Sequence, residues 1–213
     1  MNVVIFGPPG AGKGTQAQNI VKKFNLLQIS TGDLLRKEIK NKTELGRQIE
    51  QIINGGGFVS DDIVSNLLEK NLTKSLYRNK IIFDGYPRNI NQAKSLELML
   101  NNDNQSIDHI LYLKVNKATI EKRILGRVIC EKCNKTLNEY FDIQELKNHE
   151  CGKEFLKKRE DDNRQTIINR YDEYMNQTKP VLDFYSSRKK FHEIDGNLKI
   201  DEITRKIEQI LTV

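Results

Sequence analysis

The sequence predicts an α/β fold in which helices cover both faces of a five-stranded parallel sheet. Short apolar runs alternate with segments of helical spacing along the chain, which is the pattern of a doubly wound sheet. A glycine-rich turn joins the first apolar run to the first helical segment. At 213 residues the chain is long enough for one such domain with small insertions, but it is marginal for two full domains.

The elements follow from these patterns in chain order. Continuous apolar runs are typical of buried parallel strands, and they predict strands at 2–6, 27–29, 80–84, 109–115 and 191–195. Helical spacing predicts helices at 13–24, 31–41, 44–53, 61–73, 89–100, 117–127, 160–188 and 200–211. Ser30 and Asn116 are candidate N-caps, and Pro180 is a candidate bend in the longest helix. Residues 128–158 break the alternation, so we expect an inserted module there.

The chain is basic, with a net charge of +6 and a pI of about 9.1. A basic surface can bind nucleic acid. The basic residues are scattered, however, and they are not interleaved with aromatic residues as in single-strand binders. We therefore expect no nucleic-acid partner and attribute the arginines to small ligands that carry phosphate. No apolar stretch has the length of a membrane span and the N-terminus has no leader pattern, which together predict a cytoplasmic protein without a membrane partner.

Residues 7–15 read GPPGAGKGT between the first predicted strand and the first predicted helix, which is the context of a P-loop. Glycines let backbone N–H groups surround an anion, the helix N-terminus favours negative charge, and Lys13 supplies a point charge for phosphates. The segment departs from the usual pattern because Gly14 occupies the hydroxyl position and Thr15 comes one residue later. The alternative is a chance glycine turn, which the combination of strand, loop, lysine and helix disfavours.

The three cysteines, Cys130, Cys133 and Cys151, all fall in the predicted insertion. Together with His149 they offer a Cys₃His set, which is a normal structural zinc site. A C-x₂-C pair also serves redox proteins, but here it does not lie at a strand–helix junction. Three free thiols packed as small apolar groups are the other alternative.

Six blocks of the sequence resemble the adenylate kinase family at matching spacing: GPPGAGKGTQA, STGDLLR, FDGYPRNINQA, RILGR, REDDN and TKPVLDFY. The resemblance implies a monomeric enzyme with a P-loop NTPase-like core that catalyses ATP + AMP = 2 ADP with Mg²⁺. It also implies a core formed by 1–29, 60–126 and 160–213, a helical AMP-binding insertion at 30–59 and a lid at 127–159. In zinc-bearing members the second ligand pair is spaced by two residues, which would place Asn148 opposite Cys151; His149 is then the substitute ligand.

Transfer between two nucleotides brings several negative charges together, so converging arginines are expected beside one lysine and one Mg²⁺. The candidates are Arg36, Arg88, Arg123, Arg127, Arg159 and Arg170. Arg123 and Arg127 would share a face at the end of one helix, and Arg159 and Arg170 would share a face if both lay on the long helix. Asp84 ends an apolar strand, where a carboxylate commonly holds Mg²⁺ through its waters.

By resemblance, the residues of the two nucleotide sites can be named. The catalytic set would be Lys13, Arg88, Arg127, Arg159 and Arg170. The ATP site would consist of Gly10, Ala11, Gly12, Lys13, Gly14, Thr15, Arg123, Arg127 and Leu198. The AMP site would consist of Thr31, Arg36, Gly57, Phe58, Val59, Gly85, Tyr86, Pro87, Arg88, Gln92, Arg159 and Arg170, with a cis peptide before Pro87 and Gln92 at the adenine edge.

Two other functions stay open at this point. A related nucleoside monophosphate kinase could use GTP as donor or UMP or CMP as acceptor, although the long lid and Gln92 favour AMP. A nucleotide-gated switch or a nucleic-acid-binding P-loop module would need only a donor site, and the complete arginine set argues against it.

Overall fold

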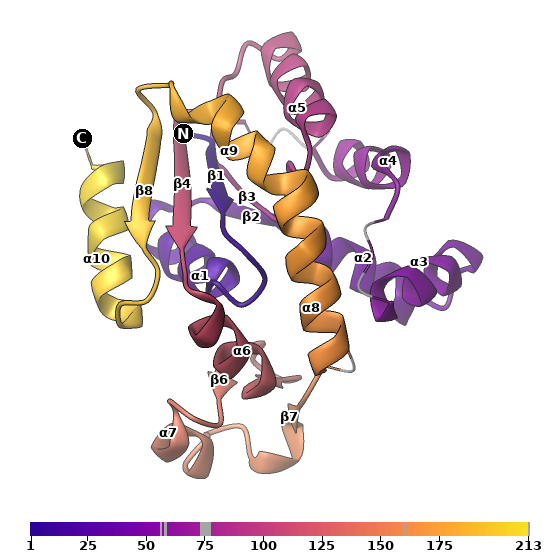
Figure 1. Cartoon of the computed structure of the whole chain (residues 1–213), viewed down its shortest axis with the longest axis vertical. Helices are drawn as coiled ribbons and strands as arrows, with labels where there is room; N and C mark the ends of the chain where they lie inside the picture. The colour runs from indigo at the N-terminus through magenta and orange to yellow at the C-terminus, as the bar shows by residue number, and fades with distance from the viewer. Residues whose placement is uncertain (56, 58, 73–77, 160, 213) are drawn as a thin grey trace.

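The structure is a computed structural model that describes every residue except 56, 58, 73–77, 160 and 213. Its centre is a five-stranded parallel sheet, as predicted, and the structure gives the strand order β2-β3-β1-β4-β8 (Figure 1). The strands are β1 (Val3–Phe6), β2 (Leu27–Ser30), β3 (Ile81–Asp84), β4 (His109–Lys114) and β8 (Phe191–Asp195). None of the described helices is both long and apolar enough to cross a membrane.

Helices pack on both faces of this sheet and enclose one apolar core on each side. On one face, α1 (Lys13–Phe24) and α10 (Ile200–Leu211) bury Ile20 and Ile207 against Ile5. The opposite core contains side chains from five further helices. These are α2 (Thr31–Lys40), α3 (Glu44–Asn54), α4 (Asp61–Leu72), α5 (Ile90–Asn102) and α9 (Lys179–Ser186). The three central strands, β3, β1 and β4, therefore lie between the two cores, which explains their largely apolar sequences.

Caps set several helix ends where the sequence predicted them. The Ser30 hydroxyl accepts a hydrogen bond from Asp33 N, and Asn116 Oδ1 accepts one from Thr119 N. The helix that Asn116 begins, α6 (Lys117–Leu125), ends at Gly126 and so does not reach Arg127 as expected. Arg127 instead opens strand β5 (Arg127–Cys130).

The long C-terminal helix also differs from the prediction. It begins as α8 (Arg164–Glu173), with Asn163 as its N-cap, and it passes through a π-helical segment at Tyr174–Thr178 before α9. The interruption thus lies directly before Pro180, whose ring cannot fit an ordinary helix interior. Arg159 precedes the helix and does not share a face of it with Arg170.

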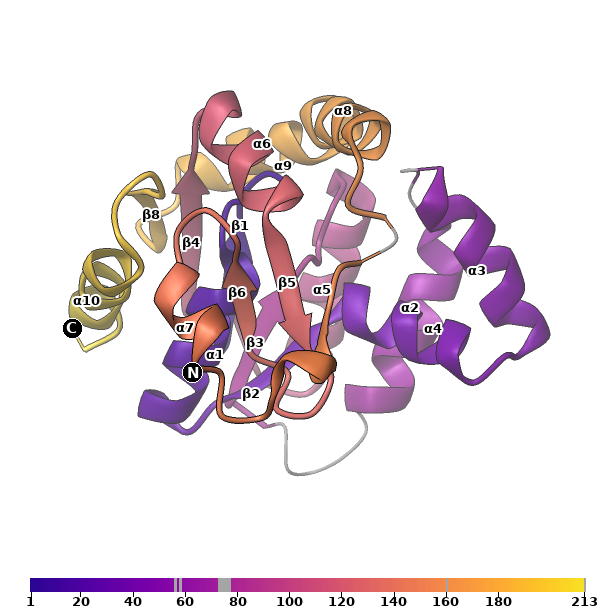
Figure 2. The ribbon, with the colours of Figure 1, turned by 90° about the horizontal axis from the view of Figure 1, so that it is seen from below.

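Residues 127–157 form a small antiparallel sheet beyond the carboxyl ends of β1 and β4 (Figures 1 and 2). Its elements are β5, β6 (Thr136–Asn138), α7 (Ile143–Lys147), a 3₁₀ turn (Lys153–Phe155) and β7 (Leu156–Lys157), and the strand order is β6-β5-β7. Val128, Cys130 and Leu137 are buried in it.

Candidate active site

Three loops meet at the carboxyl edge of the main sheet, where ligands of open α/β sheets bind. The register pairs Ser30 with Asp84 and Ile5 with Asp84. The loop after β1, the start of α2 and the turn after β3 are therefore neighbours. The Thr31 hydroxyl donates to the Gly85 carbonyl at 2.8 Å and fixes two of these loops to each other.

The loop after β1 has the conformation of a phosphate cradle. Gly10 has φ 76°, and a Cβ there would lie 2.7 Å from Ile124 Cγ1, so no other residue fits. Gly12, with φ 94°, precedes the first turn of α1. The N–H groups of that turn face the loop with the positive end of the helix dipole.

Lys13 is folded over this loop. Its Nζ donates to the carbonyls of Gly7 at 2.7 Å and Pro8 at 3.1 Å. Burial lowers the pKa of Lys13 to about 8; Asp84 opposes this change, whereas Arg88, Arg127 and Arg170 add to it. The lysine therefore lies among like charges that an anion would neutralise.

Asp84 is buried beneath the cradle. Gln28 Nε2 donates to its Oδ2 at 3.0 Å. Burial raises the pKa of Asp84, although Lys13 lowers it. A Cβ placed on Gly14 would lie 3.5 Å from Asp84 Oδ2, so the glycine at the usual hydroxyl position leaves space beside this carboxylate.

The predicted arginines converge on this edge from both sides. Electrostatic interactions join Lys13 to Arg88, Arg127 and Arg170, and Arg159 to Arg127 and Arg36. Burial, with Arg127 and Arg36, lowers the pKa of Arg159 to about 10. Its Nε is buried and has no hydrogen-bond partner among the described residues. A cluster of this kind is unfavourable without anions and favours a polyanionic ligand.

Three of these arginines pair with carboxylates that were not predicted as site residues. Arg127 pairs with Asp162, whose side chain is 3% exposed, and Arg170 pairs with buried Asp161. Although burial opposes its ionisation, Arg170 and then Arg159 lower the pKa of Asp161. Arg36 Nη2 donates to Asp33 at 2.6 Å. The two consecutive aspartates in REDDN could have indicated the partners of Arg127 and Arg170.

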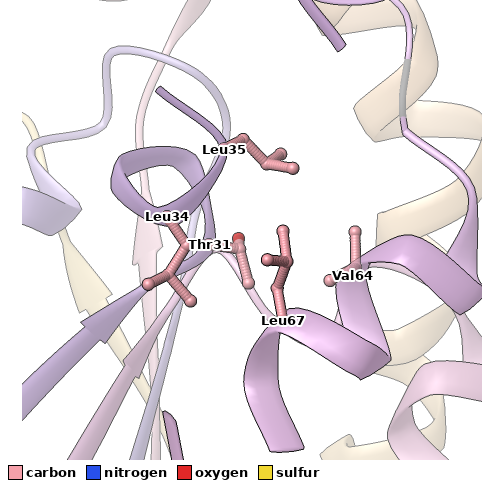
Figure 3. A pocket seen from close by; sticks show the side chains of 5 residues that line it. All are labelled: Thr31, Leu34, Leu35, Val64 and Leu67. Atoms are coloured by element: carbon pink, nitrogen blue, oxygen red, sulfur yellow. The ribbon is translucent and has the colours of Figure 1, made fainter. Parts of the chain in front are cut away.

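The predicted acceptor residues gather around the turn after β3. Arg88 Nε donates to the Gly85 carbonyl at 2.8 Å, the Tyr86–Pro87 bond is cis as predicted, and Gln92 is buried. Nearby, α2 and α4 enclose an apolar hollow that is too small for a water molecule and is lined by Thr31, Leu34, Leu35, Val64 and Leu67 (Figure 3).

The remaining acceptor candidates lie on the segment between α3 and α4. Val59 is buried, and Gly57 N donates to the Ile52 carbonyl at 3.1 Å. Phe58 lies outside the described residues. The end of α3 is in turn bonded to α8, because Asn169 Nδ2 donates to the Gly55 carbonyl at 2.9 Å.

The predicted donor residues lie on the other side of the cradle. Arg123 Nη1 donates to the Ala11 carbonyl at 3.2 Å. Gln16 Nε2 donates to the Ile200 carbonyl at 3.0 Å, so the loop that carries Leu198 lies beside the first turns of α1. Arg123 thus contacts the loop before α1, and Leu198 belongs to a segment that is bonded to α1, the helix that contains Thr15.

The four predicted metal ligands come together in the small sheet. The ligand atoms of Cys130, Cys133, His149 and Cys151 lie within 4.8 Å of one another. Cys133 Sγ is 3.6 Å from His149 Nε2. Tetrahedral zinc with bonds of about 2.3 Å to sulfur and 2.05 Å to nitrogen requires about 3.6 Å between these atoms. Burial raises the pKa of the Cys130 thiol, but hydrogen bonds led by the Cys133 N–H lower it to about 6, which favours the thiolate that a metal needs.

Comparison with known proteins agrees with this geometry. The family model described as adenylate kinase matches residues 5–190. The chain is 60% identical over 213 residues to the adenylate kinase of Pelagibacter ubique, with full coverage of both chains. It is 39% identical to the adenylate kinases of Listeria innocua and Novosphingobium aromaticivorans, with 99% of each chain covered. The chain therefore belongs to the adenylate kinase family.

Proposed function

We propose that this enzyme transfers the γ-phosphoryl group of ATP reversibly to AMP, giving two ADP. The observation that carries the proposal is the electrostatic coupling of Lys13, in the phosphate cradle, to Arg127, Arg170 and Arg88, of which Arg88 is bonded to the turn after β3. A switch that only binds a nucleotide needs the cradle, whereas transfer between two nucleotides needs cations on both sides of the moving group. Both sides belong to one chain, which supports a monomer.

On the donor side, the backbone of residues 10–15 and Lys13 hold the ATP phosphates. Arg123 lies against the adenine, Arg127 contacts donor phosphate, and the backbone near Leu198 faces the base. Asp84, which lies beside Gly14, would hold Mg²⁺ through water. The ion, when bound with ATP, supplies charge neutralisation on the phosphates.

On the acceptor side, Arg36 and Arg88 bind the AMP phosphate and Gln92 reads the adenine. Thr31, Gly85 and the segment 57–59 surround the nucleotide, together with the turn 85–87. Because the hollow between α2 and α4 is closed in this structure, the insertion 30–59 opens to admit the base. Arg159 and Arg170 then reach the transferring group.

The lid 127–159 closes over the ATP and excludes water, which would otherwise accept the phosphoryl group. Arg127 lies at the start of this segment and Asp162 lies just before α8, so their ion pair joins the two ends of the lid. The chain must bend at these two ends when the lid closes. The free cysteines gathered in metal-ligand geometry are typical of a reducing compartment, which supports a cytoplasmic location.

We further propose that Cys130, Cys133, His149 and Cys151 hold one structural Zn²⁺. Four protein ligands leave no open position for water or substrate, so the metal stabilises the lid and takes no part in transfer. The sheet that it stabilises buries few side chains, and a metal cross-link compensates for that small core.

Replacing His149 with Ala is expected to lower zinc content well below one equivalent and to reduce the melting temperature by several degrees, because a tetrahedral site loses one ligand. Elemental analysis and melting curves measure both. Asn148→Ala, an exposed neighbour, is the matched control and keeps its zinc. Full zinc and an unchanged melting curve in the His149 variant would remove this residue from the site.

Replacing Gln92 with Leu is expected to raise KM for AMP by about tenfold or more, because an adenine edge is left unpaired in a closed site. KM for ATP should change little. Steady-state kinetics with each nucleotide varied in turn measure the difference, and Gln209→Leu on the exposed face of α10 is the control. An unchanged KM for AMP would exclude Gln92 from the acceptor site.

A coupled assay of four nucleoside triphosphates against four monophosphates tests the proposed function itself. ATP with AMP should give the highest kcat/KM of the sixteen pairs. A higher value for GTP as donor, or for UMP or CMP as acceptor, would make the chain a different nucleoside monophosphate kinase. No transfer with any pair would contradict a kinase.

A further inference from the structure

We propose that Asp61, the first residue of α4, is a positioning residue that fixes the amide orientation of Gln92 and thereby selects adenine over a 6-oxopurine as the acceptor base. This inference rests on the role proposed above for Gln92. It adds a residue that neither the sequence motifs nor the arginine cluster includes, and it gives that residue a task in specificity rather than in phosphoryl transfer.

The orientation of the Gln92 amide is fixed by two partners, one that accepts a hydrogen bond and one that donates. Gln92 Nε2 donates to Asp61 Oδ1 at 2.5 Å, and Gln92 Oε1 accepts from Arg88 N at 2.7 Å. A carboxylate can only accept and a backbone N–H can only donate. Reversing the amide would therefore place a carbonyl oxygen against a carboxylate and two N–H groups against each other. Since Gln92 is 4% exposed, water cannot relieve either conflict.

Asp61 is itself held firmly in place. Asn89 Nδ2 donates to both of its carboxylate oxygens at 2.9 Å. The other end of the Asn89 amide accepts from Gln92 N at 2.8 Å and caps α5. The three side chains thus form a closed network between the first turns of α4 and α5, with each amide orientation determined by its neighbours.

The same helix that carries Asp61 also forms a wall of the apolar hollow. Val64 and Leu67 of α4 face Thr31 and Leu35 of α2 there (Figure 3). A base that entered between these walls would be held in one plane and in one register. A different base could then not shift sideways to find other hydrogen-bond partners. The orientation of the Gln92 amide therefore decides which base edge can bind.

Among the described residues, the network leaves one lone pair on Gln92 Oε1 and one N–H on Nε2 for a ligand. An acceptor beside a donor matches adenine, which presents a 6-amino donor beside the N1 acceptor. A 6-oxopurine presents the reverse, an oxygen acceptor beside an N1–H donor. It would pair well only with a reversed amide, and Asp61 opposes that reversal.

The test compares AMP with IMP, which has the same shape as AMP but carries the reversed edge. In Asp61→Asn, the new side-chain amide can donate to a reversed Gln92, so the penalty against IMP falls. We expect the ratio of kcat/KM for IMP to that for AMP to rise about tenfold or more, through a gain with IMP and a smaller loss with AMP. Both substrates are measured on one preparation, so a reduced active fraction cancels from the ratio.

Two further variants make the outcome decisive. Asp62→Asn makes the same charge change at the exposed neighbouring position and should leave the ratio within about twofold of wild type. Asp61→Ala removes both oxygens and replaces the Asn variant if that variant does not fold. An unchanged ratio at position 61, while Gln92→Leu still weakens AMP, would overturn the role of Asp61 and leave the proposed acceptor site standing. If Gln92→Leu also left AMP unaffected, both this inference and the proposed reading of the base would fail.

Discussion

Replacing Lys13 with Met is expected to lower kcat by about 10²–10³-fold, because the ammonium group neutralises charge that develops on the transferring phosphoryl group. The fold should survive, since Lys13 bonds to carbonyls of its own loop and packs into neither core. Turnover of ATP with AMP measures the loss, and melting curves check the fold. Lys22→Met, exposed on the same helix, is the matched control and should turn over normally.

The pH profile provides a second readout of the same lysine. Its pKa of about 8 in the free enzyme means that the charge is present below pH 8 and is lost as the pH rises through that value. Because kcat/KM reports the free enzyme, kcat/KM for ATP should decline above about pH 8. The residual activity of Lys13→Met should lack this decline. Near-normal kcat in the Met variant, or the same decline in both proteins, would contradict the assignment of the donor site.

Replacing Arg88 with Lys is expected to cost nearly as much as replacing it with Ala, about 10²-fold or more in kcat/KM for AMP. A guanidinium can bind a phosphate with two parallel hydrogen bonds, and an ammonium cannot. Arg88 is also held by the Gly85 carbonyl, and burial together with Arg170 lowers its pKa to about 10, so it remains charged at neutral pH. Kinetics with AMP varied and ATP saturating give the measurement.

Exposed Arg78 offers the control for that change, because Arg78→Lys makes the same exchange on the surface and should stay within about twofold of wild type. If the Arg88→Lys enzyme retained AMP activity close to that of wild type while Arg88→Ala lost it, a positive charge alone would be sufficient to bind the AMP phosphate. The proposal that Arg88 binds the phosphate through two parallel hydrogen bonds would then be wrong.

The order of the elements could be predicted because each one carries a complete local signal. The helices α1 and α10 and the strand β8 have the predicted bounds. Each of these three elements has a clear apolar pattern in the sequence, and a glycine loop or a turn lies beside it. The strand order seen in the structure pairs Ser30 with Asp84 and so places the predicted loops side by side.

The errors fall where the local signal was short. The run Arg127–Cys130 has too few residues for alternation to be told from the end of a helix, and only the pairing with β6 and β7 makes it a strand. Asn163 was a readable cap signal for α8, since its side chain accepts from Thr166 N at 2.9 Å. Placing the helix start there would have excluded a helical face shared by Arg159 and Arg170.

The partners of the site residues could not be predicted in the same way. Asp61 and Gln92 are 31 positions apart, and Arg127 and Asp162 are 35 apart. No periodicity relates residues at such distances, and the pairs exist only because the tertiary fold brings separate elements together. Motifs therefore predict which groups can bind phosphate, whereas the structure identifies the carboxylates and amides that orient them.

Phosphoryl transfer from ATP to AMP is tested by following the γ-phosphoryl group itself. ATP labelled with radioactive phosphorus at the γ-position is incubated with the enzyme and Mg²⁺, with and without AMP, and the products are separated. Direct transfer to AMP predicts that the label appears in the β-position of ADP when AMP is present, and that little is released as inorganic phosphate in either case. Label released mainly as inorganic phosphate, at the same rate with and without AMP, would contradict it.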